Sequence, residues 1–326
     1  MDTHVSKEVV KKNPTNYQFN DRKKGIRERI VADFKQNKFV ILMALPVVLW
    51  YVIFHYVPLY GISIAFKNFS PMKGIMGSPW VGLRYFNEFF QGYYAWRVIK
   101  NTLLINVYQL IFGFPAPIIL ALLLNEIKNS IFKRAVQTVT YLPHFISIVV
   151  ICGMIVDFTA KGGVINTVLS VFGWTPANLL LKPEYFRTIY IGSGIWQGIG
   201  WGSIIYLAAL SGIDTEQYEA ATIDGANRWK QFVNVTLPGI APTIIILLIL
   251  NIGRLMSEGA DKVILLYNPN TYETADIISS FVYRRGLIES NFSFSTAVGL
   301  FNSVVNLILL VTANKISRKV NETSLW

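Results

Sequence analysis

Long apolar stretches separated by polar segments dominate the chain. Six of these stretches reach the length of about 20 residues that an α-helix needs to cross about 30 Å of hydrocarbon. They lie at residues 39–65, 102–124, 136–158, 188–211, 240–258 and 294–314. Because a helix satisfies its own backbone hydrogen bonds inside lipid, the pattern predicts an all-α, polytopic membrane protein with six transmembrane helices.

The composition supports the same class. Of the 326 residues, 52% are hydrophobic and only 15% are charged, which leaves too little polar surface for a soluble globular protein. The single cysteine, Cys152, lies inside the third predicted span and cannot form an intramolecular disulfide. We therefore expect the lipid bilayer to be the solvent for most of the chain.

Basic residues are distributed unevenly between the predicted loops. With the N-terminus placed inside, eighteen Lys and Arg residues lie on the inner side and eleven lie in the outer segments. Cytoplasmic loops normally carry the excess of Lys and Arg, and an even number of spans puts both termini on one side. The bias therefore predicts that both termini are cytoplasmic.

This topology divides the chain into three parts. We expect residues 1–38 to be a basic cytoplasmic extension, residues 39–316 a six-helix transmembrane domain and residues 317–326 a cytoplasmic tail. The first span begins too late and runs too long for a cleaved signal peptide, so we interpret it as a retained membrane anchor. The basic extension lies next to the membrane, which favours contact with anionic headgroups and argues against a nucleic-acid partner.

The segment at residues 213–238, here called the 213–238 loop, is polar and lies between two of the apolar stretches. Asp214 precedes a run of good helix formers and has Gln217 three residues later, which is the pattern of an N-cap with its capping-box partner. A short helix should therefore begin near Thr215.

A turn is expected in the middle of the 213–238 loop. Asp224 and Gly225 supply a position that can adopt positive φ, so the first helix can end and the chain can reverse. A second helical stretch should then begin at Ala226. The pattern predicts a helix-turn-helix.

The 213–238 loop has surface properties that suit a protein partner. Ala220 and Ala221 leave one side of the first predicted helix nearly bare, which lets another protein approach the backbone closely. The chain as a whole carries a net charge of +11, yet this loop has only Arg228 and Lys230 against a larger set of acids. These acids are Asp214, Glu216, Glu219 and Asp224. We expect a docking site for a basic partner; an ordinary solvated loop is the alternative.

Motifs for catalysis are missing from the sequence. It contains no Gly-Lys dipeptide, so the chain has no P-loop that could hold ATP phosphates. His4, His55 and His144 lie far apart, and neither a His-Glu-x-x-His motif nor a Cys pair occurs. We therefore expect no catalytic site, no metal site and no cofactor in this chain, with energy supplied by another subunit.

Small residues recur in the fourth predicted span. Gly194, Gly198 and Gly202 are spaced four residues apart, which predicts a stripe on which another helix packs closely. A dinucleotide-binding fingerprint around Gly198 and Gly200 is excluded, because no strand precedes it and the spacing is wrong.

Polar side chains in the fifth predicted span should share one face of the helix. Asn251, Arg254 and Glu258 occur at positions i, i+3 and i+7, and polar groups inside spans usually face a cavity or a partner. Two interpretations stay open. Arg254 contacts the transported substrate, or Arg254 and Glu258 only neutralise each other.

Two further pairs of polar positions extend this candidate substrate path. Asn302 and Asn306 lie one turn apart in the sixth span, and Gln197 and Trp201 lie one turn apart in the fourth. Aromatic rings stack on sugar rings, and amides bond to hydroxyls or carboxylates. The alternative is that the amides merely join helices.

The 213–238 loop resembles the cytoplasmic EAA loop of binding-protein-dependent ABC importer permeases. In that loop Glu-Ala-Ala, a glycine a few residues later and a terminal Leu-Pro recur at this spacing, as they do here at Glu219 and Pro238. The resemblance implies that this loop couples the chain to ATPase subunits. The implied coupling residues are Glu216, Glu219, Ala220, Ala221, Asp224, Gly225, Ala226 and Pro238.

Other stretches look like one branch of the carbohydrate importer permeases, which handles complex or acidic oligosaccharides of the aldouronate, rhamnogalacturonan or alginate type. The resemblance runs from about residue 38 to the C-terminus and does not name the sugar. The stretches lie at residues 56–61, 77–83, 141–145, 275–278, 283–286 and 296–306.

The resemblance implies the fold of a type I ABC importer permease in the bacterial cytoplasmic (inner) membrane. It also implies the partners: a second, homologous permease, two cytoplasmic ATPases that bind ATP-Mg, and an extracytoplasmic solute-binding protein. The chain would form half of the translocation path for an oligosaccharide and work by alternating access. The alternative is a permease for a non-sugar solute such as a peptide or phosphate.

Overall fold

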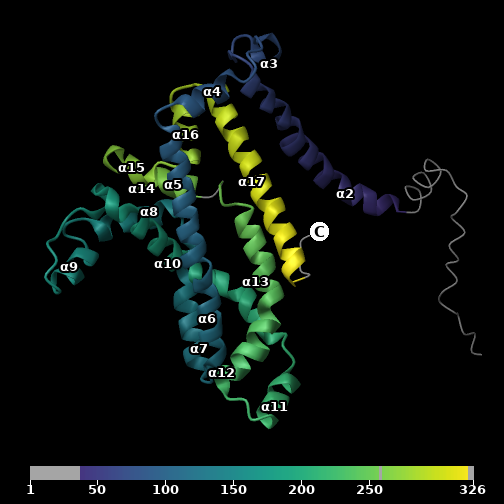
Figure 1. The fold of residues 1–326 in the computed structure, drawn as a ribbon, viewed down its shortest axis with the longest axis vertical. Coiled ribbons are helices and arrows are strands. Elements are labelled where there is room, and N and C mark those ends of the chain that lie inside the picture. Colours follow the sequence, from purple (N-terminus) through teal and green to yellow (C-terminus); the bar gives the residue numbers. More distant parts are fainter. Residues whose placement is uncertain (1–36, 257–258, 322–326) are drawn as a thin grey trace, which may run out of the picture. The chain divides into compact units, whose positions relative to one another are not determined.

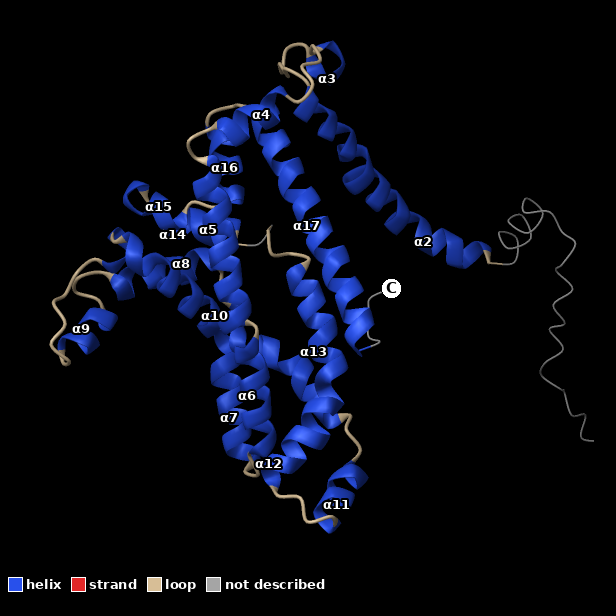
Figure 2. Cartoon of the chain, in the orientation of Figure 1, coloured by secondary structure: helices blue, strands red, loops and turns tan. Residues whose placement is uncertain are grey.

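Uncharged apolar runs fold into helices here, because a helix pairs its backbone polar groups within one segment. The computed structural model describes residues 37–256 and 259–321, and regular structure in these ranges is helical apart from one isolated bridge between Lys67 and Trp80 (Figure 2). The predicted all-α class is confirmed. The chain divides into two units, Met1–Gly61 and Ile62–Trp326, which are described separately.

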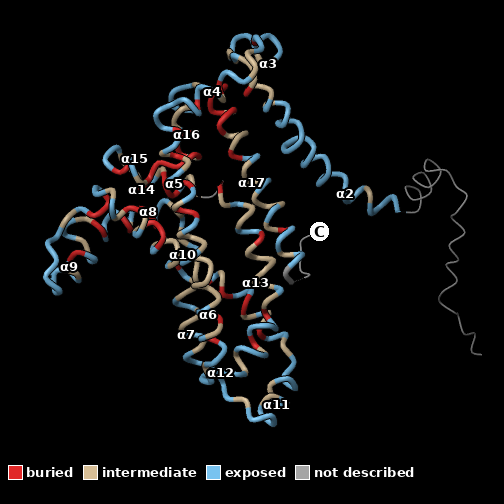
Figure 3. Tube along the Cα trace, viewed as in Figure 1, coloured by how far each residue is buried: buried red, intermediate tan, exposed pale blue. Residues whose placement is uncertain are grey.

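The first unit contains one long apolar helical segment. It begins with α2 (Lys38–Tyr51), continues through the π-helical turn η1 (Val52–Tyr56) and enters the 3₁₀ segment η2 (Val57–Phe66), which extends into the second unit. The side chains of α2 and η1 are unburied on all sides, as Figure 3 shows for α2. A helix that is apolar all round is suited to lipid.

The second unit consists of many helices joined by short turns (Figure 1). Its first half contains α3 (Gly74–Gly77), α4 (Arg84–Gln91), α5 (Ala95–Tyr108), η3 (Gln109–Gly113), α6 (Pro115–Glu126), α7 (Ser130–Tyr141), η4 (Leu142–Phe145), α8 (Ile148–Thr159), α9 (Val164–Ser170) and η5 (Leu179–Leu181). Its second half contains α10 (Pro183–Ser211), α11 (Thr215–Ile223), α12 (Arg228–Gln231), η6 (Phe232–Thr236), α13 (Leu237–Ile252), α14 (Ala260–Leu266), η7 (Pro269–Thr271), α15 (Tyr272–Ala275), α16 (Ile278–Tyr283), η8 (Arg284–Ile288) and α17 (Phe292–Asn321).

Five helices in the described part of the chain are long and apolar enough to cross a membrane. They are Lys38–Phe66, Ala95–Glu126, Ile148–Ser170, Arg228–Ile252 and Phe292–Lys319. The predicted fourth span, 188–211, is helical within α10, which has 29 residues, but it is not among these five. Glycines, serines and polar aromatic residues lower its hydropathy. Length and apolarity alone therefore identify five membrane-spanning helices in the described residues, not the six predicted from the sequence.

The third predicted span, 136–158, is wrong in its boundaries. The chain there breaks at η4, between α7 and α8, and Ile146 is extended after it. Pro143 contributes to the break, because proline lacks the backbone N–H that would continue the hydrogen bonding of α7. The apolar span begins only after the break, at Ile148.

The fifth predicted span, 240–258, is also wrong in its boundaries. Its helix begins earlier, at Arg228, and ends at Ile252, where Gly253 is the C-cap. Residues 253–256 form turns, and α14 begins after Gly259, whose φ of +90° lies in the left-handed region. The span is therefore interrupted where the sequence predicted a continuous helix face.

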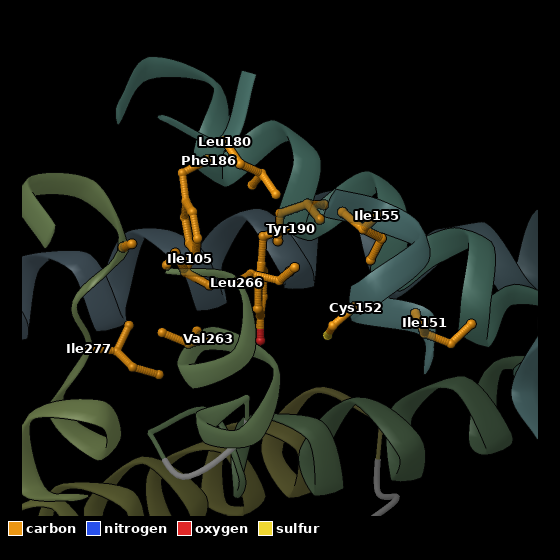
Figure 4. Packing of buried hydrophobic residues seen from close by; sticks show 12 residues of the cluster. Ile105, Ile151, Cys152, Ile155, Leu180, Phe186, Tyr190, Val263, Leu266 and Ile277 are labelled. Carbon is orange, nitrogen blue, oxygen red and sulfur yellow. The ribbon is translucent and has the colours of Figure 1, made fainter. Parts of the chain in front are cut away.

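Three buried apolar clusters hold the second unit together. In Figure 4 the first cluster joins α5, α8, α10 and α14 around Phe186 and Tyr190. The second joins α4, α5, α16 and α17 around Phe89 and Phe281. The third joins α6, α10 and α13 around Tyr206. Helices α5 and α10 each belong to two of the three clusters, so these two helices link the clusters to one another.

Two glycines let α10 approach its neighbours. A Cβ at Gly200 would lie 2.2 Å from the carbonyl oxygen of Thr140 in α7, and a Cβ at Gly202 would lie 2.9 Å from Pro117 in α6. A Cβ at Gly198 would meet nothing within 4 Å. The predicted packing stripe is therefore shifted: Gly202 is part of it, Gly198 is not, and Gly200 makes the closest approach.

Candidate coupling loop and substrate path

The first half of the 213–238 loop folds as predicted. Helix α11 begins at Thr215, and the Asp214 side chain accepts a hydrogen bond of 3.0 Å from the backbone N–H of Glu216. Gln217 donates its backbone N–H to the Asp214 carbonyl at 3.2 Å. Gly225 has a φ of +74°, so it is the positive-φ residue at which the chain reverses. The helix start, its N-cap and the turn are confirmed, whereas the predicted capping box with the Gln217 side chain does not form among the described residues.

The second half begins two residues later than predicted. Asn227 is the N-cap and its side chain accepts from the Lys230 N–H at 2.9 Å, so α12 starts at Arg228 rather than Ala226. Asn227 is a favourable N-cap, because its side chain accepts a hydrogen bond from a backbone N–H in the first turn that has no partner within the helix. The helix then continues through the π-helical turn η6 into α13, and Pro238 lies two residues after that turn, in the interior of the continuous helix Arg228–Ile252.

Side-chain hydrogen bonds fix α11 against the start of the next span. The Tyr218 hydroxyl lies 3.0 Å from Thr236 Oγ1 in η6. The Gln231 amide donates to Thr222 Oγ1 at 2.9 Å. Two side-chain hydrogen bonds thus connect α11 to the helix that leads into α13.

The remaining surface of the loop is exposed and mixed in character. Glu216, Glu219, Ala220, Asp224, Gly225 and Pro238 are exposed, and Ala221 and Ala226 are half-buried. Sequence reasoning missed two apolar residues here: Ile223 is 87% exposed and Trp229 is 69% exposed. Both could have been noticed in the sequence, because each is an apolar residue within a polar segment.

Arg228 forms its ion pair outside the loop. Its guanidinium lies 2.8 Å from Glu126 at the end of α6, and both side chains are largely exposed. An exposed pair of this kind contributes about 0–1 kcal/mol. This ion pair therefore joins the 213–238 loop to α6.

Trp201 and Gln197 lie on α10, as predicted. The Trp201 ring stacks on His144 of η4, with centroids 4.5 Å apart and planes 3° apart, and Phe145 contacts its edge. Trp201 is 47% exposed, so one part of the ring stays accessible. Gln197 is half-buried. The break at η4 thus brings a second aromatic ring to Trp201.

Asn251 lines a cavity of about 220 Å³ between α10, α13 and the π-helical turn η3. Its side chain donates to the Leu247 carbonyl of its own helix at 2.8 Å. Asn106, Gln109 and Tyr206 supply further polar atoms to the same cavity. Sequence reasoning missed Asn106 and Gln109. Both could have been found, because each is a polar residue inside the second predicted span.

Arg254 does not share a helix face with Asn251. Because α13 ends at Ile252, Arg254 lies in the turn after it and is exposed. Glu258 lies outside the described residues, so its pairing with Arg254 remains a prediction. The expectation of one continuous polar face is therefore corrected.

Asn302 and Asn306 bind the backbone at the interruption of the fifth span. The Asn302 amide donates to the Met256 carbonyl at 2.7 Å, and Asn306 Oδ1 accepts from the Met256 N–H at 3.0 Å. A broken helix leaves backbone groups that must find partners away from water. These two amides join α17 to the interruption, which favours the helix-joining interpretation over substrate contact.

The comparisons with known proteins cover most of the chain. Residues 113–322 match the family described as "Binding-protein-dependent transport system inner membrane component". The chain is 43% identical to the polygalacturonan/rhamnogalacturonan transport system permease protein YteP of Bacillus subtilis strain 168, over 93% of this chain and 95% of YteP. It is 42% identical to protein LplB of the same organism, over 91% of this chain and 93% of LplB.

Solved structures agree with these matches. A chain of a bacterial ABC transporter involved in the import of the acidic polysaccharide alginate is 44% identical, with a TM-score of 0.84 over 90% of this chain and 99% of that chain. A chain of the bacterial alginate ABC transporter in complex with alginate pentasaccharide-bound periplasmic protein is 43% identical to this chain. Its TM-score is 0.85, and the match covers 91% of this chain and 100% of that chain.

Proposed function

The chain belongs to the family of binding-protein-dependent transport system inner membrane components, and from this premise we propose that it is the permease subunit of an ABC importer for acidic oligosaccharides. The observation that carries the proposal is the 43% identity to YteP over 93% of this chain, which covers the membrane helices as well as the loop. The alginate transporter chain adds a matching fold at 44% identity.

The acidic substrate class follows from what these relatives transport. Polygalacturonan, rhamnogalacturonan and alginate are all polymers that contain uronic acid units, so each presents carboxylates to its permease. A permease for a peptide or phosphate is not favoured, because these relatives carry carbohydrates.

The 213–238 loop is the coupling element in this proposal. Two cytoplasmic ATPases hold ATP-Mg and contact the exposed acids together with Ile223 and Trp229. Closure of the ATPase pair moves α11, and the bond between Tyr218 and Thr236 passes the movement to α13. The excess of Lys and Arg in the inner segments supports a cytoplasmic loop and cytoplasmic termini.

A second, homologous permease completes the path, and a solute-binding protein delivers the sugar from the other side. On this chain the path contains Gln197 and Trp201 of α10, Asn251 beside its polar cavity, and Arg254 in the turn after α13. Trp201 offers a ring to stack on a sugar, and Arg254 offers a guanidinium to a carboxylate.

The test is sugar-stimulated ATP hydrolysis and uptake by the complete importer in proteoliposomes. The panel contains oligogalacturonates, alginate oligosaccharides, neutral oligosaccharides of equal length, a dipeptide and phosphate, each supplied with the binding protein. We expect stimulation by at least one acidic oligosaccharide. Stimulation by the neutral sugars, peptide or phosphate alone would reject the acidic substrate class.

A further inference from the structure

A buried carboxylate lies at the centre of the stretches 275–278 and 283–286. The Asp276 side chain is fully buried, and Arg284 binds it with both terminal nitrogens, at 2.6 and 3.2 Å. The Ser280 hydroxyl donates to it at 2.9 Å. Burial alone lowers the pKa of Arg284, but the hydrogen bonds and the charge of Asp276 outweigh burial, and the pKa of Arg284 lies above its ordinary value. Asp276 and Arg284 thus form a complete ion pair.

Arg97 of α5 is a second cation beside this pair. Its Nη2 lies 3.6 Å from Asp276 Oδ2, beyond hydrogen-bonding distance. Its Nε is buried and lacks a hydrogen-bond partner within the described residues. One carboxylate therefore faces two guanidinium groups and is within hydrogen-bonding distance of only one of them. A guanidinium that is not hydrogen-bonded to the buried carboxylate is suited to bind the carboxylate of a ligand.

A cavity of about 510 Å³ opens next to this cluster. Arg97, Arg284 and Arg285 line it, together with the rings of Tyr94 and Tyr272. Arg285 pairs with Glu289 and Arg284 with Asp276, whereas the Arg97 guanidinium lies 3.6 Å from Asp276, beyond hydrogen-bonding distance. Its guanidinium lies over the Tyr94 ring at 4.6 Å from the centroid, and its side chain is 27% exposed.

The cavity combines two features that bind carboxylated sugars. A guanidinium bonds two carboxylate oxygens at once, and aromatic rings contact the faces of sugar rings. The acids of the lining, Glu273 and Glu289, are exposed to solvent, where they can accept hydrogen bonds from sugar hydroxyls.

The cavity and the 213–238 loop lie at opposite ends of one continuous helix. Residues Ala95–Glu126 form a single helical span; Arg97 is in its first turn, and Glu126 at its end pairs with Arg228. At 1.5 Å per residue the two ends are roughly 44 Å apart, enough to cross the bilayer. Figure 1 shows the same arrangement, with α16 beside the start of α5 and α12 beside the end of α6.

We propose that this Arg97 cavity is a subsite that binds the carboxylate of a uronic acid unit on the side of the membrane opposite the coupling loop. The subsite rests on the proposed import of acidic oligosaccharides and is separate from the path residues on α10 and α13. It receives the sugar before the sugar reaches the interior of the permease.

The first experiment measures uptake by proteoliposomes that contain the complete importer. Trigalacturonate is compared with its carboxyl-reduced trisaccharide in the wild type, Arg97→Gln, Arg97→Lys and Lys100→Gln. Lys100 is an exposed cation three residues further along α5 and is the matched control. Because a charge-assisted hydrogen bond is lost, we expect Arg97→Gln to raise KM for trigalacturonate about tenfold with little change in maximal rate. Arg97→Lys should have an intermediate KM, and Lys100→Gln should resemble the wild type.

The second experiment locates the sugar. Asn270, an exposed residue of the lining, is changed to cysteine in a Cys152→Ser background and alkylated with a membrane-impermeant maleimide. Trigalacturonate delivered by the binding protein should slow alkylation of Asn270→Cys, and the added Arg97→Gln change should remove this protection. The carboxyl-reduced sugar should protect less.

Other outcomes would overturn the subsite and leave the proposed function standing. If Arg97→Gln lowered the uptake of trigalacturonate and of the carboxyl-reduced trisaccharide equally, Arg97 would be a purely structural residue. If Arg97→Gln instead raised the concentration of binding protein needed for uptake of both sugars, the cavity would be a docking surface for the binding protein. If the wild type imports no acidic oligosaccharide at all, the proposed function itself fails.

Discussion

Single amide side chains in this protein satisfy backbone groups that interrupted helices leave free. Asn302 and Asn306 bind both sides of Met256, and the buried Asn101 amide donates to the carbonyls of Glu273 and Asp276. Such bonds matter most in a membrane protein, because lipid offers no water to replace them.

Asn302→Leu should therefore destabilise the protein. The change keeps a similar volume but leaves the Met256 carbonyl without its buried donor, at a cost of about 1–3 kcal/mol. We expect a lower thermal unfolding temperature of the purified importer in detergent. Ser303→Ala is the control, because the exposed Ser303 bonds only within its own helix. Equal unfolding temperatures for the two variants would contradict the role of Asn302.

Gly225 tests the turn of the coupling loop. Its φ of +74° is unfavourable for a β-branched residue, whereas a Cβ there would meet nothing within 4 Å, so Gly225→Val introduces backbone strain without a clash. Strain of this kind costs about 1–3 kcal/mol. We expect assembly to persist and sugar-stimulated ATP hydrolysis to fall several-fold. Gly225→Asn, which tolerates this conformation, should retain most activity; similar activities of both variants would show that the turn geometry is unimportant.

At the scale of elements, α10 packs both through buried apolar side chains and through close approach at glycines. Its closest approach to a neighbour is at Gly200, against the α7 backbone. This explains why α10 is long enough to span a membrane but is less apolar than the other spans: part of its surface faces helices instead of lipid.

Gly200→Ala and Gly198→Ala form a matched pair on α10. A Cβ at Gly200 would lie 2.2 Å from the Thr140 carbonyl oxygen, and a backbone atom of a packed helix cannot move away cheaply. We expect Gly200→Ala to lower the yield and the unfolding temperature. Gly198→Ala should be neutral or stabilising by up to about 1 kcal/mol, because alanine favours a helix over glycine. Comparable yields and unfolding temperatures would show that α10 and α7 do not pack as described.

At the scale of the whole molecule, the proposed function makes the chain one subunit of a larger importer. It has an exposed coupling loop, helices for the membrane and a cavity at the other end, but its sequence contains no P-loop. We expect the purified chain alone in liposomes neither to hydrolyse ATP above a control preparation nor to import oligosaccharide. Uptake by this chain without its partners would contradict the proposed division of labour.

Local patterns were sufficient for several features. Runs of apolar residues predicted the helical membrane domain, although the boundaries of two spans were wrong. Asp214 predicted the start of α11, and Gly225 predicted the reversal. Each is decided by neighbouring residues: the length of an apolar run, a side chain that caps a free N–H, or a missing Cβ. The family followed from the same loop together with the stretches around it.

Only the tertiary structure decided what the polar residues inside the membrane domain do. Asn302 and Asn251 look alike in sequence, yet one binds the backbone of another segment and the other lines a cavity. The Arg97 cavity joins residues of α5 with residues more than 170 positions later. The physical reason is that hydrogen bonds and ion pairs act over about 3 Å, so their partners depend on where distant segments meet. Helix formation depends on neighbours along the chain, and the chemistry of the path depends on neighbours in space.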